Sequence, residues 1–200
     1  GKEDTLAALD AAGVVYCAQG ATAIYETRGV KIGLIGNTFP YQNSKRDISA
    51  DVKALRAEGC QIVLAVFHWG SEYEYSFNGD QRRIGRTAVK AGADAVIGHH
   101  PHVVQGIEKY EDTYILYSLG NLVFGGNVDP SDRETYLAQL TFTVGEDGSV
   151  TGPQLKIIPA LLTAQEKGTD YRPVLAEGDR AASILKKILG RSSNMEGFVN

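Results

Sequence analysis

The chain has 200 residues, 43% of them hydrophobic and 22% charged, and its net charge at pH 7 is −4. This composition is typical of a globular protein and excludes a disordered, collagen-like or coiled-coil chain. The slightly acidic balance argues against nucleic acid as the main partner, because nucleic-acid surfaces are bound by a surplus of Lys and Arg. No apolar run reaches the ~18 residues of a membrane-spanning helix, so we expect a single domain over residues 1–200 with no membrane span.

The first hundred residues predict helices that alternate with short apolar strands. A strand is expected after the turn at Arg28-Gly29, and a polar loop is expected over residues 37–47. The helices are expected at residues 5–13 (with Thr5 as N-cap), 48–58 and 81–91, and the strands at residues 14–17, 31–35, 62–67 and 95–98. Strands separated by helices of about ten residues favour parallel βαβ units.

The second half predicts shorter strands and one final helix. Apolar residues alternate with polar ones over residues 136–144, which is typical of a half-buried strand. A turn is expected at Glu146-Asp147-Gly148, where the chain reverses. Further strands are expected at residues 103–107, 114–118, 122–124 and 150–158, and a helix at residues 179–189.

All four histidines lie in two short segments that directly follow predicted buried strands. His68 follows the strand at 62–67, and His99, His100 and His102 follow the strand at 95–98. The carboxyl ends of parallel strands meet at one edge of a sheet, where ligands bind in open α/β folds. We therefore expect His68 and the second group to converge.

The local sequence of the second group predicts which histidines point together. Pro101 disfavours helical backbone at His100, so we expect an extended segment in which His100 and His102 share one side. His99 then points away and is the weaker candidate ligand, with a supporting or packing role favoured. Neutral imidazoles bind manganese, iron or zinc ions, and the pattern predicts such a site. The alternative for any single histidine is a hydrogen-bonded packing residue.

Three other features have two interpretations each. Glu72 follows His68 closely and is either a weak candidate for a catalytic base or ligand-orienting group, or a solvated loop residue. Asn121 either caps a strand end or faces the site. Spacing by four places a basic stripe on the helix at 81–91, which either steers a polyanion or, as we favour, is a solvated helix face; its residues are Arg82, Arg86 and Lys90.

Three stretches, in order and correctly spaced, resemble a known family. They are residues 68–73 (His-Trp-Gly-Ser-Glu-Tyr), 92–103 (Gly-Ala-Asp-Ala-Val-Ile-Gly-His-His-Pro-His-Val) and 117–124 (Tyr-Ser-Leu-Gly-Asn-Leu-Val-Phe). Together they resemble the bacterial capsule-synthesis protein CapA family, whose members are associated with poly-γ-glutamate synthesis. The resemblance implies an α/β fold of the calcineurin-like metallophosphoesterase type, an αββα sandwich with a two-metal site.

The resemblance assigns ligand roles to three histidines. His68 corresponds to the single histidine ligand of the phosphoesterase pattern, and His100 and His102 correspond to its paired His-x-His. Phe77 replaces a proline of the family's loop, which is a minor departure. The Asp-rich strand end and the Asn-Asn-His segment of the family's first half are absent, so we expect the N-terminal part of the fold to be missing. The three histidines that remain are expected to bind one divalent ion, whereas the complete site would hold two. We expect the chain alone to show little hydrolysis.

These observations lead to two functional hypotheses. The first is a metal-dependent, phosphoesterase-like hydrolase domain in bacterial capsule or poly-γ-glutamate synthesis, located at the cell surface or outside the cell by family analogy. Its substrate would be an anionic polymer or a phosphorylated compound. The second is a non-catalytic subunit that binds polymer or partner proteins. In either case, the missing half predicts a homodimer or completion by an N-terminal segment.

Overall fold

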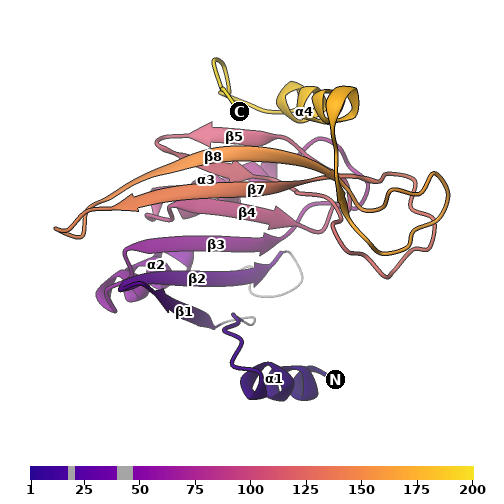
Figure 1. The fold of residues 1–200 in the computed structure, drawn as a ribbon. Coiled ribbons are helices and arrows are strands. Elements are labelled where there is room, and N and C mark those ends of the chain that lie inside the picture. Colours follow the sequence, from indigo (N-terminus) through magenta and orange to yellow (C-terminus); the bar gives the residue numbers. More distant parts are fainter. Residues whose placement is uncertain (18–20, 40–46) are drawn as a thin grey trace.

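The computed structural model describes residues 1–17, 21–39 and 47–200, and it is a mixed α/β structure (Figure 1). Four helices are α1 (Lys2–Ala11), α2 (Ile48–Ala57), α3 (Gly79–Lys90) and α4 (Gly178–Gly190). The strands in these ranges are β1 (Thr22–Thr27), β2 (Val30–Thr38), β3 (Ile62–His68), β4 (Ala95–His99), β5 (Ile107–Tyr110), β6 (Thr113–Leu116), β7 (Glu134–Val144), β8 (Val150–Leu161) and β9 (Val174–Leu175).

The strands form a six-stranded sheet in the order β1-β2-β3-β4-β6-β5 and a three-stranded sheet in the order β7-β8-β9. In the first sheet, β2, β3, β4 and β6 are parallel, while β1 and β5 pair antiparallel at the two edges. The predicted βαβ units are confirmed, because α2 connects β2 to β3 and α3 connects β3 to β4. The arrows of β2, β3 and β4 therefore end on the same side (Figure 1).

Two hydrophobic cores flank the six-stranded sheet. The neighbours Ile115 and Leu116 of β6 are both buried but belong to different cores, because successive side chains of a strand point to opposite faces. The first core joins the sheet to α2 and α3 and includes Phe67, Val96, Leu55 and Ala88. The second core joins β6 to the smaller sheet and α4 and includes Tyr136, Ile157, Ile184 and Ile188.

The face of β2, β3 and β4 that points away from α2 and α3 is only half-buried. Fully buried residues such as Val63, Ala65 and Phe67 alternate along β3 with residues that keep partial exposure. The half-buried apolar residues of this face are Ile32, Leu34, Leu64, Val66 and Ile97. Within the described ranges, no helix is both long and apolar enough to cross a membrane.

Several predicted elements differ from the structure. The first helix begins at Lys2, because Gly1 rather than Thr5 occupies the N-cap position and the Thr5 hydroxyl donates to the Gly1 oxygen. Residues 14–17 and 122–124 were predicted as strands, but neither segment forms one. Residues 103–107 contribute only an isolated bridge between Val104 and Leu119 before β5 begins.

The region after residue 20 also differs in detail. Strand β1 was not predicted; it pairs with β2 across the expected turn, where Arg28 and Gly29 have φ values of 51° and 77°. Two consecutive positive φ values are the geometry of a tight hairpin turn. The loop predicted over residues 37–47 starts later, because Asn37 and Thr38 still belong to β2, and its residues 40–46 lie outside the described ranges.

Candidate metal centre

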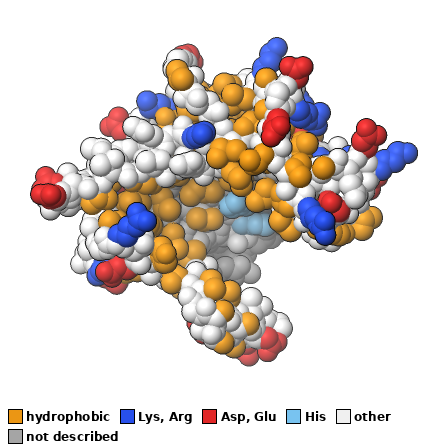
Figure 2. Space-filling view, in the orientation of Figure 1, with side chains coloured by type: hydrophobic (Ala, Val, Ile, Leu, Met, Phe, Trp, Pro, Cys, Tyr) orange, Lys and Arg blue, Asp and Glu red, His pale blue; other side chains and the backbone are white. Residues whose placement is uncertain are grey.

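The four histidines gather at the carboxyl ends of the parallel strands. β3 ends at His68 and β4 ends at His99, and these two residues are partners in the parallel register. Figure 2 shows histidine side chains in a hollow of the surface, with hydrophobic side chains around it. The parallel sheet thus brings together two segments that lie about thirty residues apart, as the strand pattern predicts.

Glu72, His100 and His102 form the tightest group of possible metal ligands. One ligand atom from each residue lies within 4.8 Å of the others. The His68 ring is next to this group, with its centroid 4.3 Å from that of His100, whereas the His100 and His102 centroids are 6.0 Å apart. The structure therefore places three of the predicted histidines together, with the exposed Glu72 carboxylate beside them.

The backbone that presents His100 and His102 is not extended, so this prediction is wrong. Their φ values are 102° and 60°, both in a region that favours glycine. Pro101 between them accepts a hydrogen bond from the Tyr73 amide at 2.8 Å through its backbone oxygen. The two imidazoles approach each other because the segment bends, and a bend held in a costly conformation is typical of functional sites.

Asn121 fixes the orientation of His102. The amide Nδ2 of Asn121 lies 3.2 Å from the backbone oxygen of His102, to which it donates, so its Oδ1 faces His102 Nδ1 at 2.8 Å. Because Oδ1 only accepts, Nδ1 carries the hydrogen of this bond. A neutral His102 then keeps its lone pair on Nε2, which is the nitrogen available to a metal ion. Of the two interpretations of Asn121, the structure favours the one in which it faces the site.

The segment that carries Glu72 is tied to the rest of the molecule by two glutamines. Gln105 donates through Nε2 to the backbone oxygen of Glu74 at 2.8 Å, and Gln81 donates to Oε1 of Gln105 at 2.8 Å. Both glutamines are buried. Buried, hydrogen-bonded amides of this kind hold a loop in one place, which positions Glu72 beside the histidines.

The electrostatic environment favours neutral imidazoles. Desolvation lowers the pKa of His68 below its ordinary value of 6.5, and the other three histidines, His100 foremost, lower it further. The Glu72 carboxylate acts on this pKa in the opposite direction. Desolvation also lowers the pKa of His99, which ends β4 and is not in the group of three ligands. A lowered pKa keeps the ring of His68 neutral over a wider pH range, and a neutral ring presents the lone pair that a metal cation binds.

Two residues near the site were not singled out from the sequence. Asn37, in β2, is 5% exposed, and its Nδ2 has no hydrogen-bond partner in the described part of the chain. Its register partner is Phe67, one residue before His68. Phe124 packs against His102 with ring centroids 4.8 Å apart. The sequence signal for Asn37 is a polar residue near the end of an apolar strand, and Phe124 lies in the predicted strand at residues 122–124, which does not form.

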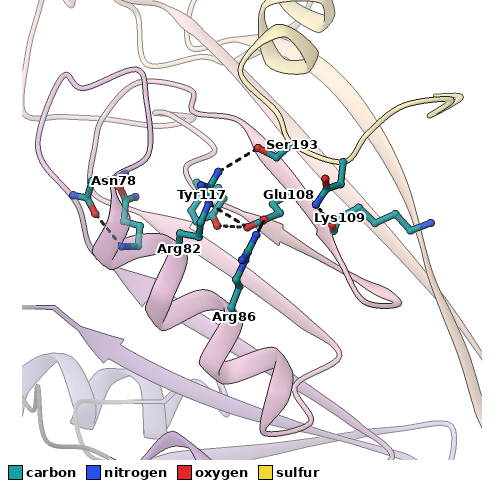
Figure 3. Close-up of polar contacts among 9 residues, drawn as sticks. Asn78, Arg82, Arg86, Glu108, Lys109, Tyr117 and Ser193 are labelled. Atoms are coloured by element: carbon teal, nitrogen blue, oxygen red, sulfur yellow. Dashed lines mark hydrogen bonds and ion pairs between the residues drawn. The ribbon is translucent and has the colours of Figure 1, made fainter.

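The basic stripe on α3 is largely part of a buried ion-pair network (Figure 3). Glu108 has a fully buried side chain whose Oε1 lies 2.5 Å from Arg86 Nη2 and whose Oε2 lies 3.9 Å from Arg82 Nε. The Tyr117 hydroxyl donates to Glu108 at 2.6 Å, and burial together with this bond raises the pKa of Tyr117. Two members of the stripe therefore neutralise a buried carboxylate, and only Lys90 is simply exposed.

Comparison with known proteins identifies the family of this chain. The model of the bacterial capsule synthesis protein PGA_cap matches residues 1–126. The chain is 52% identical over 63 residues to the PGA biosynthesis protein CapA of Bacillus subtilis (strain 168), covering 32% of this chain and 17% of that protein. It is 30% identical over 148 residues to the capsule biosynthesis protein CapA of Bacillus anthracis, covering 62% of this chain and 36% of that protein.

A third relative carries a different description. A probable polyglutamine synthesis accessory protein of Mycobacterium tuberculosis (strain ATCC 25618 / H37Rv) is 31% identical over 114 residues, covering 54% of this chain and 30% of that protein. Each match spans between 17% and 36% of the relative's length. Because the family model covers more than half of the chain, the chain belongs to the bacterial capsule synthesis protein PGA_cap family.

Proposed function

We propose that His68, His100, His102 and Glu72 hold a divalent metal ion. The residues fit such an ion, since one carboxylate and three imidazoles are the donors that manganese, iron and zinc accept. Glu72, His100 and His102 already have ligand atoms within 4.8 Å of one another. The Asn121 hydrogen bond leaves Nε2 of His102 as the ligand atom. The group Glu72, His100 and His102 is the observation that carries this proposal.

From this site we infer a metal-dependent, phosphoesterase-like hydrolase domain that acts in capsule or poly-γ-glutamate synthesis at the cell surface or outside the cell. A bound divalent ion supplies Lewis acidity and lowers the pKa of a water ligand. The chain's own residues orient the ligands: Asn121 fixes His102, and the buried Gln81 and Gln105 hold the segment of Glu72. A calcineurin-like arrangement with an anionic polymer or phosphorylated substrate agrees with the strand-end position of the histidines.

A second candidate function is a non-catalytic accessory role. Within the described residues, Glu72 is the only carboxylate in the ligand group, whereas a two-metal hydrolase needs several to bridge and neutralise its ions. The mycobacterial relative is described as an accessory protein. In this case, the chain would bind polymer or partner proteins, and the metal would stabilise the fold. Either role is compatible with a homodimer or with completion by another segment.

Metal analysis of the purified chain tests the proposal. The variant H100N/H102N removes both imidazoles, and asparagine tolerates the positive φ of these positions better than alanine does. The matched control is H99N, which removes a neighbouring imidazole outside the ligand group. We expect stoichiometric manganese, iron or zinc in the wild type and in H99N, and a loss of at least ~90% of it in H100N/H102N. Equal metal content in all three proteins would overturn the site.

Activity and binding assays separate the two functions. Hydrolysis of bis(p-nitrophenyl) phosphate that depends on added metal and disappears in H100N/H102N supports the hydrolase. Metal binding without hydrolysis, combined with poly-γ-glutamate affinity that a chelator does not change, supports the accessory role. For the chain alone we expect weak hydrolysis, because carboxylate ligands beyond Glu72 are absent from the group.

A further inference from the structure

A second hollow, about 330 Å³ in volume, adjoins the histidine site. We call it the basic cleft. Its charged lining residues are Arg133, Arg180, Lys187, Arg191, Asp132 and Glu134. Four cations thus face two carboxylates in a chain whose net charge is −4. Such a local surplus of positive charge in a concave surface concentrates anions.

Three of the cations belong to one face of α4 and its C-cap. Arg180, Lys187 and Arg191 are spaced by seven and four residues, which is the spacing of a single helix face. The row spans about 16 Å at 1.5 Å per residue. A row of this length exceeds the size of one carboxylate or phosphate group. It matches a ligand that presents several anionic groups in a line.

Glu134 demonstrates how the cleft receives a carboxylate. Lys187 Nζ lies 2.8 Å from both carboxylate oxygens of Glu134, and Arg180 Nη2 lies 3.1 Å from Oε1. The Glu134 side chain is 10% exposed, whereas those of Arg180 and Lys187 are 55% and 46% exposed. Both cations therefore keep donors that face solvent, and these donors are available to a second carboxylate.

The other two cations are held in place before any ligand arrives. Arg191 donates to the Val104 oxygen at 2.7 Å, and its guanidinium lies 4.4 Å from the centre of the Tyr75 ring. Arg133 forms an ion pair with Asp129 through Nη2, and its buried Nε has no hydrogen-bond partner among the described residues. A guanidinium that is already ordered loses little entropy when it binds an anion.

The basic cleft lies next to a small pocket that includes His102 and Asn121. Ser131 and Asp132 line the cleft and also line a small pocket that includes His102 and Asn121. These two shared residues place the basic cleft beside the pocket of His102. The cleft itself shares no residue with the ligand group of Glu72, His100 and His102.

We propose that the basic cleft is a metal-independent binding site for a linear polymer with repeated carboxylates, which it directs toward the histidine site. Carboxylates are favoured over phosphates because Glu134 already occupies part of the cleft with its two oxygens paired to Lys187. The proposal rests on the proposed function only in taking the polymer to be the substrate of the histidine site. Binding at the cleft and metal binding at the histidines use different residues, so they can fail separately.

Binding of a fluorescently labelled poly-L-glutamate decamer to the full chain, in the presence of EDTA, tests the site. The variant R180Q/K187Q removes two exposed cations of the cleft. The control K90Q/K186Q removes the same charge from exposed residues outside the cleft, and Lys186 is adjacent to Lys187 on α4. Circular dichroism and the fluorescence of Trp69, the only tryptophan, verify that each variant is folded.

We expect R180Q/K187Q to weaken decamer binding about tenfold, since it removes two exposed cations that each contribute modestly to binding. The control is expected to stay within twofold of the wild type, and salt is expected to weaken all binding. Equal losses in the two charge variants would mean that only net charge matters and would overturn the proposal. Absence of decamer binding, or equally tight binding of inorganic pyrophosphate, would overturn it as well.

Discussion

Asn121 contacts His102 at both ends of its amide, through Oδ1 to the ring at 2.8 Å and through Nδ2 to the backbone oxygen at 3.2 Å. The two bonds determine each other, because the backbone oxygen accepts only from the nitrogen end of the amide. They hold a histidine whose φ of 60° is costly for a residue with a side chain. One residue from a later loop thus sets both the tautomer and the position of a candidate ligand.

The first prediction concerns this pair. Asn121→Leu removes both bonds, so His102 loses its preferred tautomer, and metal affinity is expected to fall by about 10- to 100-fold. Asn121→Asp keeps an acceptor for Nδ1 and is expected to retain most of the affinity. Titration with manganese or zinc, followed by calorimetry, measures both. If the two variants bound metal equally well, the orienting role of Asn121 would be wrong.

The second prediction concerns the buried Glu108 and its partner Arg86. Arg86→Met leaves a fully buried carboxylate without its closest cation, and we expect a loss of about 3–5 kcal/mol in the free energy of unfolding. Glu108→Gln should cost less, because the Arg86 side chain is 37% exposed and water can solvate it. The double variant should recover part of the loss of Arg86→Met. Urea denaturation of the four proteins measures this cycle, and a cost for Glu108→Gln larger than that for Arg86→Met would contradict it.

The third prediction uses two glycines with opposite surroundings. A Cβ on Gly98 would lie 2.1 Å from the Tyr117 oxygen and 2.4 Å from Trp69 Nε1, where the indole donates to that oxygen. Gly98→Ala is therefore expected to cost about 3 kcal/mol or more of stability. Gly79, at the start of α3, has no atom within 4 Å of such a Cβ, and Gly79→Ala is expected to be neutral or to stabilise by up to about 1 kcal/mol. Trp69 fluorescence during denaturation reports both.

The fourth prediction concerns pH in the metal-free protein. The folded pKa of His68 lies below the unfolded value of about 6.5, so the unfolded state binds the proton more readily. The contribution of His68 to stability is therefore fully present above pH 6.5, falls as the pH drops below 6.5, and is lost once the pH passes the folded pKa. His68→Gln is expected to flatten the stability profile in this window. Denaturation between pH 5 and 8 in EDTA measures the difference, and parallel profiles for the two proteins would refute the shift.

The histidine cluster was predictable because it depends on features that are close together in the sequence. The apolar runs at β3 and β4 are long enough for buried strands, and a helix of suitable length connects them, so their ends must meet at one sheet edge. His68, His100 and His102 follow those ends directly. The helix predicted at residues 81–91 is confirmed as α3, and it too depends on local sequence. Asn78 and Gln81, only three residues apart, form a capping box that starts this helix.

Other features required the tertiary structure. Whether Arg82 and Arg86 face solvent depends on Glu108, which is distant in sequence and is buried only because β5 pairs with β6 at the sheet edge. The bend at His100 depends on the Tyr73 amide, and the tautomer of His102 depends on Asn121.

Hydrophobic periodicity and local spacing are enough to predict the alternation of strands and helices, the sheet edge that carries the histidines and the family resemblance. Long-range packing is needed to bring Glu72 beside His100 and His102, to make residues 122–124 a loop beside the site, and to form the basic cleft near it. Hydrogen bonds and ion pairs between distant segments have no periodicity along the chain, so the order of residues does not reveal them.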